Sequence, residues 1–194
     1  GNYAAKTVEG GFYYRNPNTR GGVFSNDGGE TLLIGDVRDA RDGVLDGSSN
    51  CPVVRIVNNR PDPAALARVF ADDNCFSYQE MFPGGFTPQF GGDVKDYSAI
   101  VGIRGQSEKR VSWGASAGFG SNEVQFFIDN TVNASLGPDS PTLFDPGLYR
   151  QEEINLNLRA GYPVSSSVHL AGGLEWRDEK FTIGVGQRES WVNG

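Results

Sequence analysis

Apolar and polar residues alternate strictly in the C-terminal half of the chain. Over residues 154–162 every second position is Ile, Leu, Ala or Tyr, and Asn155, Asn157 and Arg159 stand between them. The alternation resumes over residues 168–176, after the short polar segment 163–167. A two-residue period is that of a β-strand and does not fit a helix. The pattern therefore predicts an antiparallel hairpin.

Two further strands are predicted upstream by the same period. Residues 97–104 alternate, a polar turn follows at 105–110, and residues 111–130 alternate again. In the second of these strands the apolar positions change from odd to even numbers after Gly120. A slip of one residue turns the side chains to the other face, so we expect a β-bulge near Gly120 and Ser121. Residues 8–14 are expected to hold the end of one more strand.

The positions opposite the apolar set decide between two all-β architectures. They carry mostly Gly, Ser and Asn, with an occasional Arg or Glu, whereas the water-facing side of a soluble β-sandwich tends to carry Lys, Glu and Thr. Bulky aromatic residues stand near the strand ends, as in the interfacial girdle of a membrane β-barrel. They are Tyr97, Trp113, Tyr162 and Trp176.

Connection lengths alternate along the chain. The turns at 105–110 and 163–167 are short, whereas the connections at about 133–150 and 16–93 are long. Outer-membrane barrels alternate short periplasmic turns with longer extracellular loops in this way. The fold class that we expect is therefore all-β, with antiparallel strands of a partial transmembrane β-barrel, long loops and one short loop helix. A soluble sandwich stays the alternative.

The long segment 16–93 is expected to contain local order. Asp62 is a good N-cap and Pro63 suits the first helical position, so a helix of about two turns is predicted over residues 62–70. Cys51 and Cys75 flank this helix, and a disulfide between them is favoured over two free buried thiols. Closing such a loop with a disulfide is expected to stabilise the folded state by about 3 kcal/mol.

Candidate binding residues also fall in this segment. The aromatic residues Tyr78, Phe82, Phe86 and Phe90 are candidates for stacking on a small ligand. A small loop core that packs on the helix at Leu66 and Phe70 is favoured over this interpretation. An acidic run is a weak calcium candidate, because it lacks the spacing of an EF-hand loop and surface loops of this composition are usually only solvated. Its residues are Asp36, Asp39, Asp42 and Asp46.

Composition and charge exclude some functions. The formal net charge is -7, so no basic surface is available for nucleic acid. No apolar stretch reaches 18 residues, the length expected of a transmembrane helix. The N-terminus lacks the apolar centre of a signal peptide, so we expect that a signal was removed or that the chain begins within a longer protein. With His169 as its single histidine and no paired carboxylates in a recognisable site, the chain is expected to be no enzyme and to bind no organic cofactor or metal.

Several segments resemble the barrel of TonB-dependent outer-membrane receptors, over nearly the whole chain. They are YRNPNTRGGVF at 14–24, FPGGFTPQFGGD at 82–93, NASLGPDSPTLFDPG at 133–147, GLEWR at 173–177, and the loop helix with its flanking cysteines. The resemblance implies a barrel of about 22 strands closed by a plug domain. The chain would supply about five of these strands and no plug.

The resemblance also implies a function and a location. Such receptors lie in the bacterial outer membrane and take up scarce ligands, such as metal chelates, cobalamin or oligosaccharides, with energy transmitted by TonB. The partners that it implies are membrane lipid, the rest of the barrel and its plug, TonB, and a small ligand that this sequence does not identify. The alternative from another class is a secreted β-sandwich module that binds carbohydrate.

Overall fold

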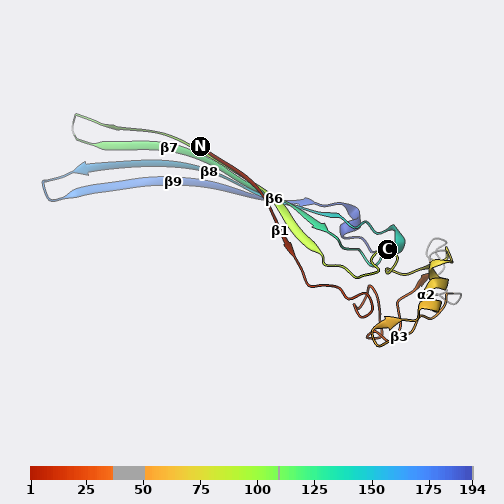
Figure 1. Cartoon of the computed structure of the whole chain (residues 1–194). Helices are drawn as coiled ribbons and strands as arrows, with labels where there is room; N and C mark the ends of the chain where they lie inside the picture. Colours follow the sequence, from red (N-terminus) through yellow and green to blue (C-terminus); the bar gives the residue numbers. More distant parts are fainter. Residues whose placement is uncertain (37–50, 109, 194) are drawn as a thin grey trace. The chain divides into compact units, whose positions relative to one another are not determined.

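The computed structural model describes residues 1–36, 51–108 and 110–193. Its main feature is a five-stranded sheet in the order β1-β6-β7-β8-β9, drawn as long arrows in Figure 1. The all-β antiparallel architecture expected from the alternation is confirmed. The strands are β1 (Asn2–Gly11), β6 (Gln89–Gln106), β7 (Ser112–Asp129), β8 (Phe144–Pro163) and β9 (His169–Val185).

The smaller elements lie mostly between β1 and β6. The helix α2 (Pro63–Phe70) is joined there by two pairs of two-residue strands. Two short 3₁₀ helices follow later, η1 (Gly137–Asp139) after β7 and η2 (Arg188–Ser190) after β9. The paired strands are β2 (Gly35–Asp36) with β5 (Cys75–Phe76), and β3 (Ile56–Val57) with β4 (Arg60–Pro61).

The predicted hairpin of the C-terminal half is confirmed. β8 and β9 pair without interruption, from Gly147 opposite Val185 to Pro163 opposite His169. The strands extend further than the alternation indicated, because β6 begins at Gln89 and β8 at Phe144. The first long connection therefore ends before residue 93, and the second ends before residue 150.

The predicted bulge in β7 is wrong. On one side of Gly120, a Cβ at Gly102 would lie 3.0 Å from the Cβ of Ser116. On the other side, Asn122 donates a hydrogen bond to Asp96. Both contacts belong to one antiparallel register, since each strand advances six residues between them, whereas a bulge would add one residue to β7 alone. Since the register is unbroken, the apolar residues of β7 before Gly120 lie on one face of the strand, and those after it, such as Phe126, lie on the other.

The chain divides into two compact units. The first contains residues 1–8, 91–126 and 147–186, and the second contains residues 9–90, 127–146 and 187–194. Every buried apolar residue that the structure describes belongs to the second unit. The first unit is a single layer of sheet, in which large apolar residues are exposed. Ile100, Leu170 and Leu174 are examples.

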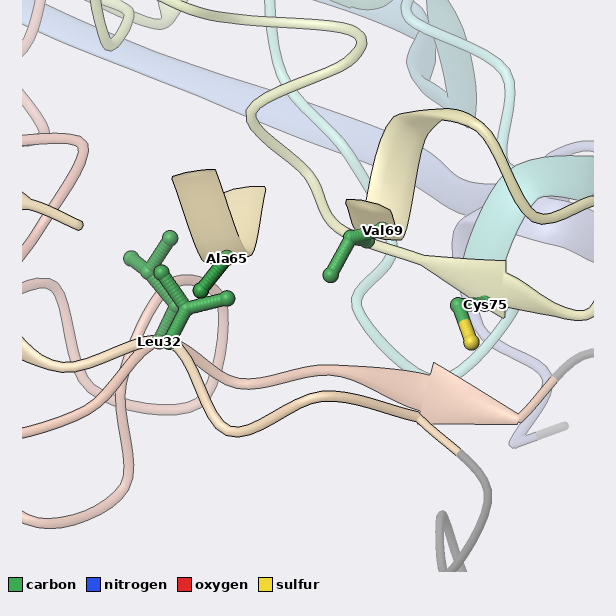
Figure 2. Packing of buried hydrophobic residues seen from close by; sticks show 5 residues of the cluster. Leu32, Ala65, Val69 and Cys75 are labelled. Atoms are coloured by element: carbon green, nitrogen blue, oxygen red, sulfur yellow. The ribbon is translucent and has the colours of Figure 1, made fainter. Parts of the chain in front are cut away.

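The helix α2 and the Cys75 end of the disulfide belong to one of two hydrophobic clusters in the second unit. Asp62 caps the helix by accepting hydrogen bonds from the backbone of Ala64 and Ala65 at 2.9 and 3.0 Å, as the sequence predicted. One helix face, with Ala65 and Val69, is buried against Leu32, Val54 and Cys75 (Figure 2). The short helix is thus held by side chains from three further segments of the second unit.

The predicted disulfide between Cys51 and Cys75 is confirmed. It closes a loop over 24 residues, and the Cys75 end is buried in the same core. We expect the double variant Cys51→Ala/Cys75→Ala to destabilise the second unit by about 3 kcal/mol. Limited proteolysis should then cleave near α2 faster, while the far-ultraviolet signal of the long sheet is unchanged. Equal cleavage rates with and without the disulfide would contradict this expectation.

Asp27 organises a tight turn in the second unit. Its carboxylate accepts hydrogen bonds from the hydroxyls of Thr31 and Ser25, at 2.6 and 2.8 Å, and from the backbone amides of Glu30 and Thr31, both at 3.0 Å. The Thr31 hydroxyl contributes most to holding the pKa of Asp27 well below its usual range. The ionised form therefore stabilises this turn.

A pH dependence follows from Asp27. A pKa that is lower in the folded state gives stability that is present above about pH 4 and is lost as the pH falls toward the folded pKa. Asp27→Asn should lower the unfolding temperature of the second unit at pH 7, and the difference from wild type should shrink below about pH 4. Near-ultraviolet circular dichroism measures the unfolding temperature of each variant at each pH, with Asp73→Asn, at an exposed position, as the control. A difference that does not vary with pH would rule out this role.

Candidate membrane-spanning surface

Cross-strand contacts show which side chains share a face of the five-stranded sheet. In the β8–β9 ladder Leu156 lies opposite Trp176, and Asn155 lies opposite Arg177. A Cβ at Gly118 of β7 would lie 2.6 Å from the amide of Asn155, which puts the even positions of β7 on the side of Asn155. We call the two sides of the sheet the Leu156 face and the Asn155 face.

The Leu156 face carries a continuous apolar band. Each of the four alternating segments predicted from the sequence contributes apolar residues to this same side, as the pairing registers require. The side chains are largely exposed, and Leu158, in the middle of the apolar run of β8, is 56% exposed. The band comprises Tyr97, Ala99, Val101, Ile103, Trp113, Ala115, Ala117, Phe119, Ile154, Leu156, Leu158, Ala160, Tyr162, Leu170, Leu174 and Trp176.

Charged residues on the Leu156 face occur only beyond this band, toward the ends of the strands that join the long connections. Two pairs cross neighbouring strands there: Arg150 with Glu123, and Lys180 with Glu152 at 3.9 Å. Among the residues that the structure describes on this face, none inside the band is charged. The surface is thus apolar over the middle of the sheet and ionic past one edge.

The edge of the band is inclined to the rows of paired residues. On β6 the band ends at Tyr97. The residues that lie in line with Tyr97 across the sheet are Ser121 of β7, Glu152 of β8 and Lys180 of β9. On β9, however, the edge lies at Trp176, four residues before Lys180. From β6 to β9 the edge therefore shifts by four residues, about 13 Å, along the strands, while the three spacings between these strands add up to about 14 Å. The edge is thus oblique, and the strands are inclined by about 40° to its normal. Strands of transmembrane barrels tilt by about 35–45°.

The Asn155 face is polar over the same length of sheet, apart from the exposed Ile100 of β6. Along β8, Asn157 donates to Asn155 at 3.3 Å, and Asn155 donates to Glu153 at 3.0 Å. Arg177 of β9 continues this network with an ion pair to Glu153 at 3.7 Å, and it also pairs with Glu175 at 3.1 Å. These groups satisfy one another and present polar atoms to water.

Small residues of β7 make room for these side chains. Gly114, Ser116, Gly118 and Gly120 lie on the Asn155 face, and the amide of Asn155 lies over Gly118. A Cβ at Gly114 would lie 3.0 Å from the guanidinium nitrogen Nε of Arg159. The large polar residues of β8 are therefore spread flat over β7, which explains the run of glycine and serine that the sequence showed opposite the apolar set.

The four aromatic ligand candidates of the loop do not form one exposed surface. Tyr78 and Phe86 are buried in a cluster with Phe24 and Phe76, and Phe82 packs against it. Phe90 is outside this cluster and contacts the ring of Phe12. Ligand contact by any of these residues stays a prediction, and only partly exposed rings remain accessible for it, on Phe82 and Phe90.

Tyr78, Phe82 and Phe86 belong to a small loop core, as the sequence favoured, but the predicted packing of this core on the helix is wrong. Leu66 packs against the separate core that contains Val54 and Val69, and Phe70 is exposed. The aromatic cluster instead contacts the segment after β7, where the hydroxyl of Tyr78 donates to the carbonyl oxygens of Asn133 and Gly137, each 3.2 Å away. Burial raises the pKa of Tyr78 to about 12, so this hydroxyl stays neutral as a structural donor.

The calcium candidate falls mainly outside the described residues. Asp39, Asp42 and Asp46 are not described, and Asp36 ends the two-residue strand β2. His169, the single histidine of the chain, lies at the start of β9 and is exposed. Within the ranges that the structure describes, no three His, Cys, Asp or Glu side chains are grouped so that they could hold a metal ion.

Comparisons with known proteins give no match: no protein-family model, no curated protein and no solved structure matches the chain. None of the described helices is long and apolar enough to span a membrane.

Proposed function

We propose that this chain is part of a transmembrane β-barrel in the bacterial outer membrane, and that the barrel belongs to a TonB-dependent active transporter. The observation that carries the proposal is the apolar band of the Leu156 face, which is uncharged, ends in Tyr and Trp side chains, and is followed by ion pairs. Such a surface is favourable in lipid, because exposing apolar side chains to water costs free energy and placing them in lipid does not.

The opposite face supports a water-filled interior. Its hydrogen-bonded network around Arg177 and Asn155 has the polarity of a barrel lumen, and the two neighbouring pairs of strands are joined by short turns at one end. The incline of the band edge agrees with the tilt of barrel strands. The outer edges of β1 and β9 would pair with further strands of the same barrel.

The secreted sandwich is supported less well. A sandwich needs a second sheet against the apolar face, and the first unit, as far as the structure describes it, is a single layer. Transport itself rests on the family resemblance of the sequence. The proposed partners are lipid, the remaining barrel and plug, TonB and a scarce small ligand, with no nucleic acid.

Uptake in cells tests the transport proposal. Cells with and without the gene, and with and without TonB, are grown with one limiting nutrient at a time: a ferric chelate, cobalamin or an oligosaccharide. We expect one nutrient to support growth only when both the gene and TonB are present. Growth that depends on the gene but not on TonB would contradict the proposed energy source, and absence of the protein from the outer-membrane fraction would contradict its location.

A further inference from the structure

The Asn155 face changes character toward the end of the sheet that joins the long connections. There β7, β8 and β9 place apolar residues on the face that is polar elsewhere. Three aromatic rings form a row across these strands: Phe126 and Tyr149 are 5.1 Å apart between ring centres, and Tyr149 and Phe181 are 5.6 Å apart. Tyr149 and Phe181 are also 48% and 60% exposed. The row is a platform of ring faces and edges open to solvent.

A polar pocket adjoins this aromatic row. Its volume is about 330 Å³, and on the Asn155 face it is lined by Asp96, Asn122, Gln151 and Glu153. Gln151 joins the two features, because it lies directly opposite Phe181 in the β8–β9 ladder and follows Tyr149 on the same face of β8. Asn122 and Asp96 are held in place by a hydrogen bond between them.

The chemistry of the pocket selects among ligand classes. Carboxylates and carboxamides offer both donors and acceptors to hydroxyl groups. No lysine or arginine is among the described residues that line it. Asp96 adds negative charge to the pocket, whereas the charge of Glu153 is balanced by Arg177, 3.7 Å away. An anionic chelate would be repelled by the carboxylate of Asp96 and would find no cationic side chain in the described lining of the pocket. A sugar ring, in contrast, offers an apolar C–H face to an aromatic side chain and hydroxyl edges to polar groups.

We propose that this end of the Asn155 face is a binding site for an uncharged oligosaccharide, with Phe126, Tyr149 and Phe181 as the stacking platform and Asp96, Asn122, Gln151 and Glu153 as hydroxyl partners. The inference rests on the proposed transport function, for which it names the substrate class. In that setting the site faces the lumen near the extracellular loops, where a ligand enters. The polar network around Asn155 continues from the site along β8.

Titration calorimetry on the full-length protein in detergent micelles tests the site, with maltohexaose, cellohexaose and xylohexaose as probes and a ferric tris-catecholate as the anionic comparison. We expect one hexasaccharide to bind saturably, and Phe181→Ala and Gln151→Ala each to weaken its binding about tenfold or more. The matched controls are Phe70→Ala, an exposed ring on α2, and Gln106→Ala, at the turn end of β6. Both controls should bind within about twofold of wild type.

The outcomes separate the inference from the proposed function. Binding of the catecholate alone, of no hexasaccharide, or equal weakening by the control variants overturns the sugar site. If outer-membrane fractionation finds the protein in that membrane, the transporter proposal survives such a result. Sugar binding that Phe181→Ala weakens, in a protein absent from the outer membrane, would support the site and overturn the transporter.

Discussion

Leu158→Arg is expected to destabilise the folded protein in a membrane by about 2–4 kcal/mol. Leu158 lies in the middle of the apolar band on β8, which runs from Ile154 to Tyr162, and an arginine at the middle of the lipid-facing side of a barrel costs about this much. If the same position faced water, the change would be nearly neutral, because Leu158 is exposed in the sheet and makes few contacts to lose. The prediction therefore separates lipid from water as the surroundings of this face.

The adjacent variant Asn157→Arg is the matched control. It adds the same charge to the same strand one position away, on the Asn155 face, where Arg159 and Arg177 already lie. Its effect should stay below about 1 kcal/mol. Urea unfolding of the full-length protein in phospholipid vesicles measures both variants. Equal effects of the two substitutions would show that the faces do not differ in environment.

The 194-residue chain alone is expected to associate in detergent-free buffer and to be dispersed by detergent. Burying one large apolar side chain is worth about 1.5–3 kcal/mol, and the Leu156 face exposes several, among them Ile103, Leu158 and Leu174. Their combined exposure costs as much as the whole stability of an ordinary domain. Association or a micelle covers this surface, and the outer edges of β1 and β9 add sites for further pairing.

Analytical ultracentrifugation measures this association. Wild type should sediment as oligomers or larger species in buffer and as a single species in a mild detergent. The control is a chain in which Leu156, Leu158 and Leu174 are replaced by Thr, which keeps β-propensity and removes apolar surface. That control should associate less. A wild-type chain that is monomeric in buffer, with this face open to water, would contradict the membrane proposal.

The strands and their faces were predictable because the two-residue period is local. The large apolar residues of β8 over 154–162 and of β9 over 169–176 lie on the Leu156 face, as the alternation indicated. The beginning of β6 was not predictable, since Phe90, Gly91 and Gly92 do not alternate. Pairing with β1, a partner 80 residues or more away, is what makes this segment a strand.

The change of phase in β7 had two explanations, and the sequence favoured the wrong one. A bulge and a change of the apolar side give the same pattern along one strand. The neighbouring strands distinguish them, because Tyr149 and Phe181 place aromatic rings on the same face as Phe126. The sequence shows aromatic residues at an even position of β7 and at odd positions of β8 and β9. Only the register between the strands shows that these positions lie on the same face.

The loop core could be predicted only in part. The cap at Asp62 and the disulfide follow from residue types that are close in sequence. The two clusters around Val54 and Phe86 join segments that have no local signal for each other, such as Phe24 with Phe86. Sequence patterns do not fix such long-range packing, and this is why the aromatic residues were wrongly placed on the helix.

Spin labels on consecutive residues of β8 test the central claim most directly. Both native cysteines are bonded to each other, so a label attaches to one introduced cysteine at a time. The full-length protein, with cysteine in place of Leu156, Asn157, Leu158 or Arg159, is placed in vesicles, and collision with oxygen and with a water-soluble nickel complex is compared. We predict that the labels at 156 and 158 favour oxygen, as in lipid, and that those at 157 and 159 favour nickel. Labels that favour nickel at all four positions would contradict a membrane-spanning sheet.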